Sequence, residues 1–439
     1  MTADVTWDVD TSTPVVVLKL DPNVFHHGGL GVIRSLGRMG VPVHVVHEDV
    51  LAPAAASKYV HGRWQWNPGS AHPDHVRVGL TRLAERIGRP SVLVATDDAG
   101  AIFLAEHGEP LRGWFLFSAP DRDLPRRAAG KDSLVRLCRE LDFPCPETTL
   151  RTSLDDALNF VDRVGLPVFA KRARPWRSAP ETHRRSTTLV RTRDELAALF
   201  LSPVAAADDP LVLQELVPGG PHADWFFHAY CDDRSTCRPG FTGIKLRSYP
   251  PHAGITTLGR TAVNDRLRGE VERLLRDLGY RGLVDLDLRF DSRDERYKLL
   301  DFNPRVGAQF RLFEDSGCLD VARAAYLDLT GQTLPDHAPA QERRFLVENY
   351  DTLAAFAYIR RGELDLRSWA SSLREVDEVA WFARDDLAPF GLMCVRLAWR
   401  VLRWRQGGRT RGPSPEPPRY RPGRARLGRH AVASGQTAL

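Results

Sequence analysis

The segment Leu283–Arg305, LVDLDLRFDSRDERYKLLDFNPR, constrains the fold of this chain more than any other stretch. Apolar and polar residues alternate on both sides of a polar turn, which predicts two antiparallel strands over 283–290 and 296–302. Side chains two residues apart on a strand face the same side of a sheet. The predicted pair of strands therefore presents acidic side chains from both of its members on one face.

Three side chains of this pair have the chemistry of a metal site. Asp301 and Asn303 lie two apart at the end of the second strand, and Asp287 can face them from the first. Two carboxylates and an amide oxygen suit Mg²⁺, as one ion or two, with Mn²⁺ as an alternative. Arg305 follows at once, and a metal beside a cation suits nucleotide phosphates. A strand that ends in an Asn-Pro turn would have the same sequence, DFNPR, so this sequence alone leaves a purely structural role open.

Residues 14–125 alternate between strands and helices. Strands are expected at 14–20, 41–47 and 91–95, and helices at 32–39 and 99–107. This order is typical of an α/β unit with a parallel, Rossmann-like sheet, which we assign to residues 1–125. Gly28–Gly31 predict a tight turn, but Arg34 stands where a dinucleotide-binding fingerprint has its third glycine. A turn that faces another ligand, or none, is therefore favoured over a dinucleotide site.

After residue 125 the pattern is that of an α+β domain. Helices are expected at 128–141, 153–165, 265–278 and from a capping box at Thr192 onward, and further strands at 166–173, 211–217, 225–230 and 240–247. Helical patterns at 350–359, 366–373 and 388–404 predict a helical C-terminal region over 338–405. Residues 406–439 are rich in Gly, Pro and Arg and are expected to form a disordered basic tail.

Charge and cysteine content exclude several classes of protein. The formal net charge is +5, but residues 408–439 carry seven arginines and one glutamate, so the remainder is near neutral. Because a nucleic-acid-binding fold needs a basic face, no nucleic acid is expected on the folded body. The six cysteines form no CxxC pair, and no stretch holds about 20 consecutive apolar residues. With a polar first segment that lacks the pattern of a secretory signal, these features predict a cytoplasmic protein.

Lysine is rare, since six lysines stand beside 55 arginines. An ammonium and a guanidinium are not interchangeable, so a lysine kept in such a chain is more often required as lysine. Lys131 lies in the first helix after the change of pattern, Lys171 ends the strand PVFAK, and Lys245 lies in GIKLRSYPPHAGITT. A solvated role for Lys131 and a strand-end role for Lys245 stay open, whereas burial of an unpaired Lys171 would be costly.

These residues together resemble the ATP-grasp superfamily of carboxylate–amine ligases, and within it the ATP-dependent carboligases similar to D-aspartate ligase. The resemblance covers about residues 14–335 and implies a two-lobed ATP-grasp domain over 126–337, with lobes at 126–213 and 214–337. The residues that it assigns are Asp287, Asp301 and Asn303 to the metal, Arg305 to the oxyanion, Lys131, Lys171 and Lys245 to the phosphates and the neighbouring adenine region, the backbone of Gln214, Glu215, Leu216 and Val217 to adenine, and Asp224 to the ribose.

The resemblance implies an ATP-dependent ligase with ATP and Mg²⁺ as cofactors. Such an enzyme phosphorylates a carboxylate and lets an amine displace the phosphate, so its main task is positioning and charge stabilisation. Amino acids or small peptides are the expected substrates, and a homodimer is left open. Tyr249–Gly254 is expected to cover the reacting end, and Arg247 and Arg260 to clamp a substrate carboxylate.

Two features keep other functions open. The loop 172–186 contains no glycine and many arginines, whereas the family has a glycine-rich loop there. Either guanidinium groups bind the phosphates, or the loop closes only on substrate, or the chain is an inactive nucleotide-binding scaffold. The helix at 390–404, apolar with interspersed arginines, precedes the basic tail. The helix and tail predict peripheral contact with a membrane, or a tethered interaction protein, unless the helix simply packs and the tail is solvated.

Overall fold

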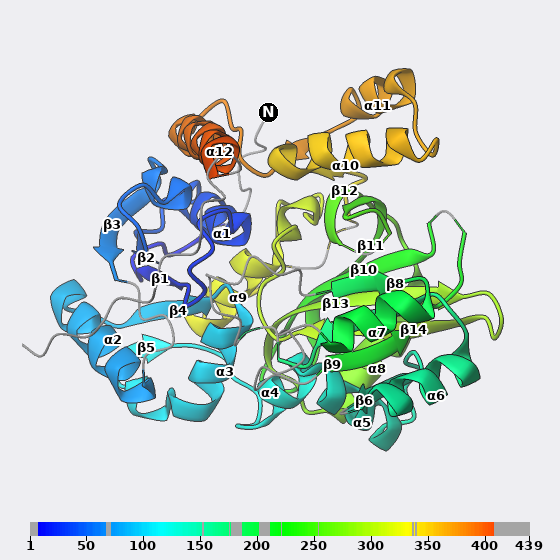
Figure 1. The fold of residues 1–439 in the computed structure, drawn as a ribbon. Helices are drawn as coiled ribbons and strands as arrows, with labels where there is room; N and C mark the ends of the chain where they lie inside the picture. The colour runs from blue at the N-terminus through cyan, green and yellow to red at the C-terminus, as the bar shows by residue number, and fades with distance from the viewer. Residues whose placement is uncertain are drawn as a thin grey trace, which may run out of the picture. The chain divides into compact units, whose positions relative to one another are not determined.

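Three β-sheets organise the part of the chain that the structure describes (Figure 1). The computed structural model describes residues 8–66, 72–151, 153–174, 176, 187–201, 211–220, 222–252, 254–335, 338 and 340–407. Within these residues a parallel sheet comes first, and two sheets built mostly of antiparallel pairs follow. The mixture of parallel and antiparallel sheets with helices predicted from the sequence is confirmed.

The first sheet has the order β3-β2-β1-β4-β5, and all its neighbouring strands are parallel. Its elements are β1 (Val15–Leu18), β2 (Val43–His47), β3 (Val60–Gln65), β4 (Ser91–Ala95), β5 (Phe115–Leu116), α1 (His27–Gly37), α2 (Pro73–Ile87) and α3 (Asp98–His107). The expected strands correspond to β1, β2 and β4, whereas β3, β5 and α2 were not predicted. The strand order reverses between β1 and β4, and ligands of α/β sheets bind beyond the carboxyl ends at such a point.

Asp97 joins the two segments that leave this edge of the sheet. Its carboxylate accepts from the backbone N–H of Leu20 at 2.6 Å and of Asp21 at 2.8 Å, both after β1. It also caps α3, accepting from the N–H of Gly100 at 2.7 Å. The loop after β1 and the first residue of α3, Asp98, are therefore held side by side.

The glycines expected to form a turn lie inside α1, so that prediction was wrong. A Cβ added at Gly31 would lie 2.7 Å from the ring of Phe310, and one at Gly28 would lie 3.1 Å from Cα of Ala308. The distance at Gly31 is shorter than Cβ atoms approach other atoms in real proteins. The small residues therefore serve the close packing of the helix against Ala308–Phe310, a segment far away in sequence, and not a change of chain direction.

The second sheet has the order β6-β9-β7-β8 with antiparallel neighbours. Its elements are β6 (Thr148–Arg151), β7 (Val168–Arg172), β8 (Thr187–Val190), β9 (Leu211–Glu215), α6 (Leu154–Val164) and α7 (Arg193–Leu201). The N-terminal caps predicted for the two helices are present, because Ser153 accepts from the N–H of Asp156 and Thr192 from that of Glu195. Most of the loop 172–186, namely 175 and 177–186, lies outside the described residues.

The single helix expected over 128–141 is two helices, α4 (Leu124–Ala129) and α5 (Lys131–Glu140). Gly130 between them has extended backbone angles, which ends the first helix and starts the second. The N–H of Lys131 donates to the carbonyl of Ala173 at 3.0 Å. The start of α5 is therefore tied to the end of β7, which carries Lys171.

The third sheet has the order β14-β13-β10-β11-β12-β15-β16. Its strands are β10 (Asp224–Cys231), β11 (Cys237–Tyr249), β12 (Ile255–Thr261), β13 (Gly282–Asp291), β14 (Arg296–Asn303), β15 (Arg344–Leu346) and β16 (Glu378–Val379). Helix α8 (Asp265–Asp277) packs its buried residues Leu267, Val271, Leu274 and Leu275 in a core shared with β10, β13 and β14. One face of the central strands is thus apolar, and polar residues gather on the other.

After β14 the described residues form the helices α9 (Val321–Leu329), α10 (Glu348–Arg360), α11 (Leu366–Leu373) and α12 (Ala388–Gly407). The region 338–405 was expected to be helical, but it also supplies the short strands β15 and β16 to the third sheet. Helix α10 packs on β11 and β12 (Figure 1). By its contacts the chain divides into Met1–Val395 and Arg396–Leu439, and the domain boundaries expected at 125 and 337 stay predictions. Residues 408–439, most of the expected tail, lie outside the described residues. Within the described part, no helix has the length and apolar character to cross a membrane.

Asp386→Ala should destabilise the protein, because it leaves the buried guanidinium of Arg34 without its carboxylate. Asp386 accepts from Nε of Arg34 at 3.0 Å and from Oγ of Ser57 at 2.8 Å. Loss of one partner of such a buried pair costs about 3–5 kcal/mol, to be measured by urea unfolding. The control is Asp385→Ala, a half-exposed partner of Arg38, for which about 1 kcal/mol or less is expected. Equal losses in the two variants would contradict the assignment.

Candidate active site

A cleft of about 530 Å³ gathers nearly all the residues predicted to form the site. It is lined by Lys171, Gln214, Glu215, Leu216, Val217, Asp224, Lys245, Asp287, Asp301, Asn303 and Arg305, and Lys131 contacts its floor through Asp301. These residues come from the second sheet, the third sheet and α5. The loop after β1, the start of α1 and helix α10 add Asn23, Phe25, His26, His27 and Tyr350 to the lining.

The acidic residues of the cleft are fixed by the pairing of β13 with β14. Asp287 lies opposite Asp301, and Asp285 lies opposite Asn303. The structure thus brings together the three metal ligands predicted from the sequence. Asp285 was missed, although it lies two residues before Asp287 and therefore shares its face. The alternation of polar and apolar residues that placed Asp287 on the cleft face would also have placed Asp285 there.

Lys131 and Lys171 both approach Asp301. Their Nζ atoms lie 2.5 Å and 3.5 Å from Oδ1 of Asp301. Burial raises the pKa of the Asp301 carboxyl, but the two ammonium groups outweigh burial and hold that pKa well below its usual range. Burial lowers the pKa of Lys171, and Asp301 opposes this shift. Both lysines could therefore exchange their contact with Asp301 for a contact with a polyanion such as a phosphate group.

Lys245 forms a second pair with Asp287, with Nζ 2.8 Å from Oδ1. Burial lowers the pKa of Lys245, but Asp287 outweighs burial, so the pKa is raised above its ordinary value. Burial also raises the pKa of Asp287, an effect that the Lys245 ammonium reduces without reversing. The pair sits in the same cleft as Asp301, and the charges of the two pairs interact.

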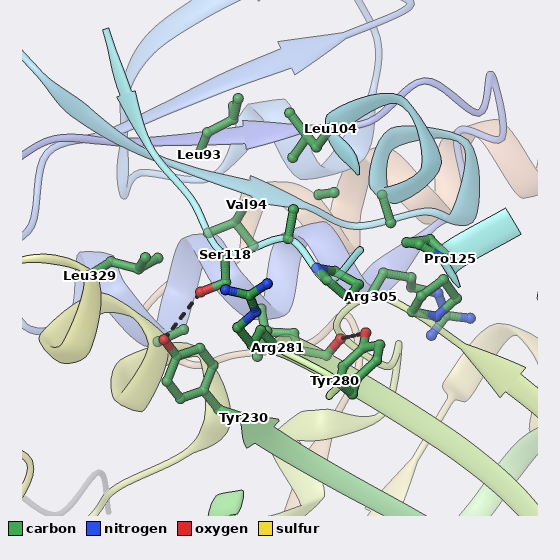
Figure 2. A pocket seen from close by; sticks show the side chains of 18 residues that line it. Leu93, Val94, Leu104, Ser118, Pro125, Tyr230, Tyr280, Arg281, Arg305 and Leu329 are labelled. Atoms are coloured by element: carbon green, nitrogen blue, oxygen red, sulfur yellow. Dashed lines mark hydrogen bonds between the residues drawn. The ribbon is translucent and has the colours of Figure 1, made fainter. Parts of the chain in front are cut away.

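Arg305 is held by two carboxylates from different parts of the chain. Its Nη1 donates to Oδ2 of Asp285 at 2.8 Å, and its Nε lies 3.4 Å from Oδ1 of Asp98 at the start of α3. Burial lowers the pKa of Arg305, but Asp98 and Asp285 outweigh burial and raise it. Figure 2 shows that Arg305 also lines a small cavity together with Tyr230 and Tyr280.

The donor set fits Mg²⁺ that arrives with phosphates. Asp287, Asp301 and Asn303 supply hard oxygens, and Mg²⁺ is often bound by one or two carboxylates together with substrate phosphates. Each carboxylate already pairs with a lysine, so a cation that approached alone would compete with an ammonium. Among the described residues no group of three or more His, Cys, Asp or Glu side chains is arranged to hold a metal, and the set here depends on Asn303 as its third ligand.

The predicted adenine segment lies at one end of the cleft, where β9 ends. The side chain of Glu215 accepts from the N–H of Glu147 at 3.0 Å and lies 3.1 Å from Arg293, so this carboxylate serves the fold. Asp224 accepts from Arg289 at 2.5 Å, and Arg289 also donates to the carbonyl of Val217 at 2.7 Å. Arg289 therefore fixes the end of the segment against β10.

Two arginines expected to clamp a substrate lie elsewhere, so that prediction was wrong. Arg247 is buried and donates from Nε and Nη2 to the two oxygens of Asp351, on α10, at 2.9 and 3.0 Å. Arg260 lines a separate cavity with Trp225 and Glu342. The sequence showed their charge but could not show that α10 supplies a carboxylate to Arg247.

Comparisons with known proteins agree with this geometry. The chain is 26% identical over 313 residues to the D-aspartate ligase of Enterococcus faecium, and the alignment covers 66% of this chain and 71% of that protein. An N5-carboxyaminoimidazole synthetase from Staphylococcus aureus complexed with ADP has a TM-score of 0.58, with 11% identity over 81% of this chain and 88% of that chain. The biotin carboxylase domain of the Hydrogenobacter thermophilus 2-oxoglutarate carboxylase, in complex with MgADP, ADP and bicarbonate, has a TM-score of 0.55, with 12% identity over 75% and 72%.

No family model matches the chain. The D-aspartate ligase relative confirms the resemblance to the ATP-grasp ligases and the predicted class of enzyme, a ligase that forms C–N bonds, and the solved structures confirm the fold. The solved structures are below 25% identical and therefore bear on the fold alone. The roles of the individual residues stay predictions.

Asp301→Asn should make the stability of the protein less sensitive to acid. The folded-state pKa of Asp301 lies below its ordinary value, so its contribution to stability is present above the unfolded-state pKa of about 4 and is lost as the pH falls toward the folded-state pKa. The free energy of unfolding, measured in urea between about pH 6 and 3, should fall less for Asp301→Asn than for the wild type. Asp265→Asn, at an exposed position of α8, is the control and should follow the wild type.

Proposed function

We propose that this chain, which resembles the ATP-grasp ligases in sequence and in fold, is an ATP-dependent ligase that joins a carboxylate to an amine through an acyl phosphate. One observation carries the proposal: Asp287, Asp301 and Asn303 share one cleft with Lys171, Lys245 and Arg305, and Lys131 pairs with Asp301 from α5. Oxygen ligands for a divalent cation beside cations for phosphates are the parts that phosphoryl transfer requires.

ATP and Mg²⁺ fit this cleft as cofactors. Asp287, Asp301 and Asn303 would hold the metal, which would supply positive charge to neutralise the phosphates. Lys171 and Lys245 would turn from their carboxylates to the phosphates. The backbone of Leu216 and Val217, beyond the end of β9, would read adenine, and Asp224 would lie near the ribose.

The reaction has two steps that concentrate negative charge. A carboxylate oxygen of the first substrate attacks the γ-phosphorus, and ADP leaves. The amine then attacks the acyl carbon, phosphate leaves with the electrons of the C–O bond, and the nitrogen loses a proton. Arg305, fixed between Asp98 and Asp285, would hold the acyl phosphate and stabilise the tetrahedral oxyanion.

The substrates would occupy the end of the cleft formed by Asn23–His27, Tyr249 and Tyr350. Burial lowers the pKa of His27 to about 4, so this imidazole is neutral at physiological pH. A neutral side chain neither repels an amine nor attracts a carboxylate. Amino acids or small peptides are substrates of suitable chemistry, and the homodimer, the cytoplasmic location and any contact of the tail with a membrane are further predictions.

A substrate screen tests the proposal. Purified protein, ATP and Mg²⁺ are combined with pairs of amino acids and small peptides, and ADP formation is followed by mass spectrometry of the product. ADP formation that depends on both substrates, and that EDTA abolishes, would support a ligase. Binding of ATP without turnover across the whole panel would instead support a nucleotide-binding scaffold.

Arg305→Ala should lower kcat by about 10²-fold or more, because a preorganised donor to the oxyanion is lost. The KM for ATP should stay within about threefold of the wild type, since the transition state gains most from this contact. Arg281→Ala is the control, because Arg281 lines the small cavity of Figure 2 and is not among the described residues that line the cleft. A wild-type kcat in Arg305→Ala would remove Arg305 from the chemistry.

Lys171→Met should raise the KM for ATP by about tenfold, which corresponds to one lost contact with a charged group. The methionine keeps the length and apolar stem of the side chain at this buried position of β7. Lys58→Met, at an exposed position after Ser57, is the control and should keep the KM of the wild type. Steady-state ADP release measures both, and an unchanged KM in Lys171→Met would contradict a phosphate role.

A further inference from the structure

His228 occupies a fully buried position on β10, beside Asp285 of the neighbouring strand β13. It is 0% exposed, and in the pairing of β10 with β13 it lies opposite Asp285. Its surroundings in the sequence, FFHAY, are those of an ordinary buried strand and give no sign of a functional histidine. A polar side chain at such a position is costly unless its environment gives it a partner.

Aromatic rings flank the His228 imidazole. The ring centroid lies 5.8 Å from that of Phe226 and 5.0 Å from that of Phe313. A Cβ added at Gly307 would overlap the ring of His228, so only glycine at that position admits the imidazole. Gly307, which lies two residues after Arg305, therefore leaves the space that the imidazole of His228 occupies.

One polar group approaches the ring. Nε2 of His228 lies 3.2 Å from Oδ1 of Asp285, and within the described part of the chain neither ring nitrogen has a hydrogen-bond partner of standard geometry. Contacts of this kind are often imperfectly aligned before a substrate binds. Burial lowers the pKa of His228 to about 4, so the ring is neutral and carries its proton on one nitrogen.

The other oxygen of Asp285 contacts residues with proposed roles. Oδ2 of Asp285 accepts from Nη1 of Arg305 at 2.8 Å and from Nδ2 of Asn303 at 3.4 Å. A carboxylate held at one oxygen alone can rotate about its Cβ–Cγ bond, and Arg305 would then lose a fixed partner. A donor at Oδ1 would prevent this rotation.

We infer that His228 is a positioning residue, whose Nε2–H donates to Oδ1 of Asp285 and thereby holds Oδ2 for Arg305. The expected effect on catalysis rests on the proposed function. The expected effect on the contact between Arg305 and Asp285 rests on the observed contacts alone. Asp98, the first residue of α3, also contacts the guanidinium. Arg305 is therefore fixed between the start of α3 and the His228–Asp285 pair. Asp285 is likewise a positioning residue, since it acts through Arg305 and Asn303.

A matched pair of variants separates positioning from packing. His228→Gln keeps an N–H at about the distance of Nε2 from the backbone, whereas His228→Leu fills the site without a donor. The first measurement is a crystal structure of the full chain for each variant. We expect the contact between Arg305 and Asp285 to persist in His228→Gln and to be lost in His228→Leu. An unchanged contact in a folded His228→Leu would overturn the inference, whether or not the protein is a ligase.

The second measurement is steady-state kinetics with a substrate pair from the screen. His228→Leu should lower kcat by about 10- to 100-fold with a KM for ATP within about threefold, and His228→Gln should recover most of the loss. A general loss of packing would instead affect both variants and both constants, and that outcome would overturn the inference. His44→Leu, at a partly buried histidine on β2, is the control. If the wild type turns over no pair, the proposed function fails, and the crystal structures alone decide on His228.

Discussion

Two carboxylates held side by side across β13 and β14 impose the constraint that the rest of the cleft satisfies. Asp287 and Asp301 lie opposite each other in the ladder, and like charges so placed in a partly buried site cannot stay ionised without compensation. The compensation comes from Lys131, Lys171 and Lys245, which belong to α5, β7 and β11. The ion pairs therefore do more than neutralise charge, since they fix where three elements meet.

Much of this site could be predicted because its signals are local. The alternation around Asp287 and Asp301 gives the strands, their common face and their oxygen chemistry within one short segment. The scarcity of lysine marked Lys171 and Lys245 before any contact was known. A residue whose neighbours in sequence define its role can be interpreted from the sequence alone.

The remaining features depend on contacts between distant segments. Asp98 reaches Arg305 only because Asp97 ties the loop after β1 to the start of α3. His228 gains its significance from the register of β10 with β13 and from the missing side chain of Gly307. In the same way, Gly31 resembled a turn residue until Phe310 supplied the reason for its size. Local patterns cannot carry this information, because the partner is hundreds of residues away or on another strand.

The balance of charge in the cleft explains why a nucleotide and a divalent cation would bind together. ATP alone would bring its phosphates to the lysines but would also face Asp287 and Asp301, and Mg²⁺ alone would have to displace an ammonium from each carboxylate. If the two arrived together, each lysine would leave its carboxylate for a phosphate, and the carboxylates would be free to hold the metal. The lysines that tie α5 and β7 to β14 would then act through the nucleotide. Binding of the nucleotide would therefore preserve the connection between the sheets that the ion pairs first establish.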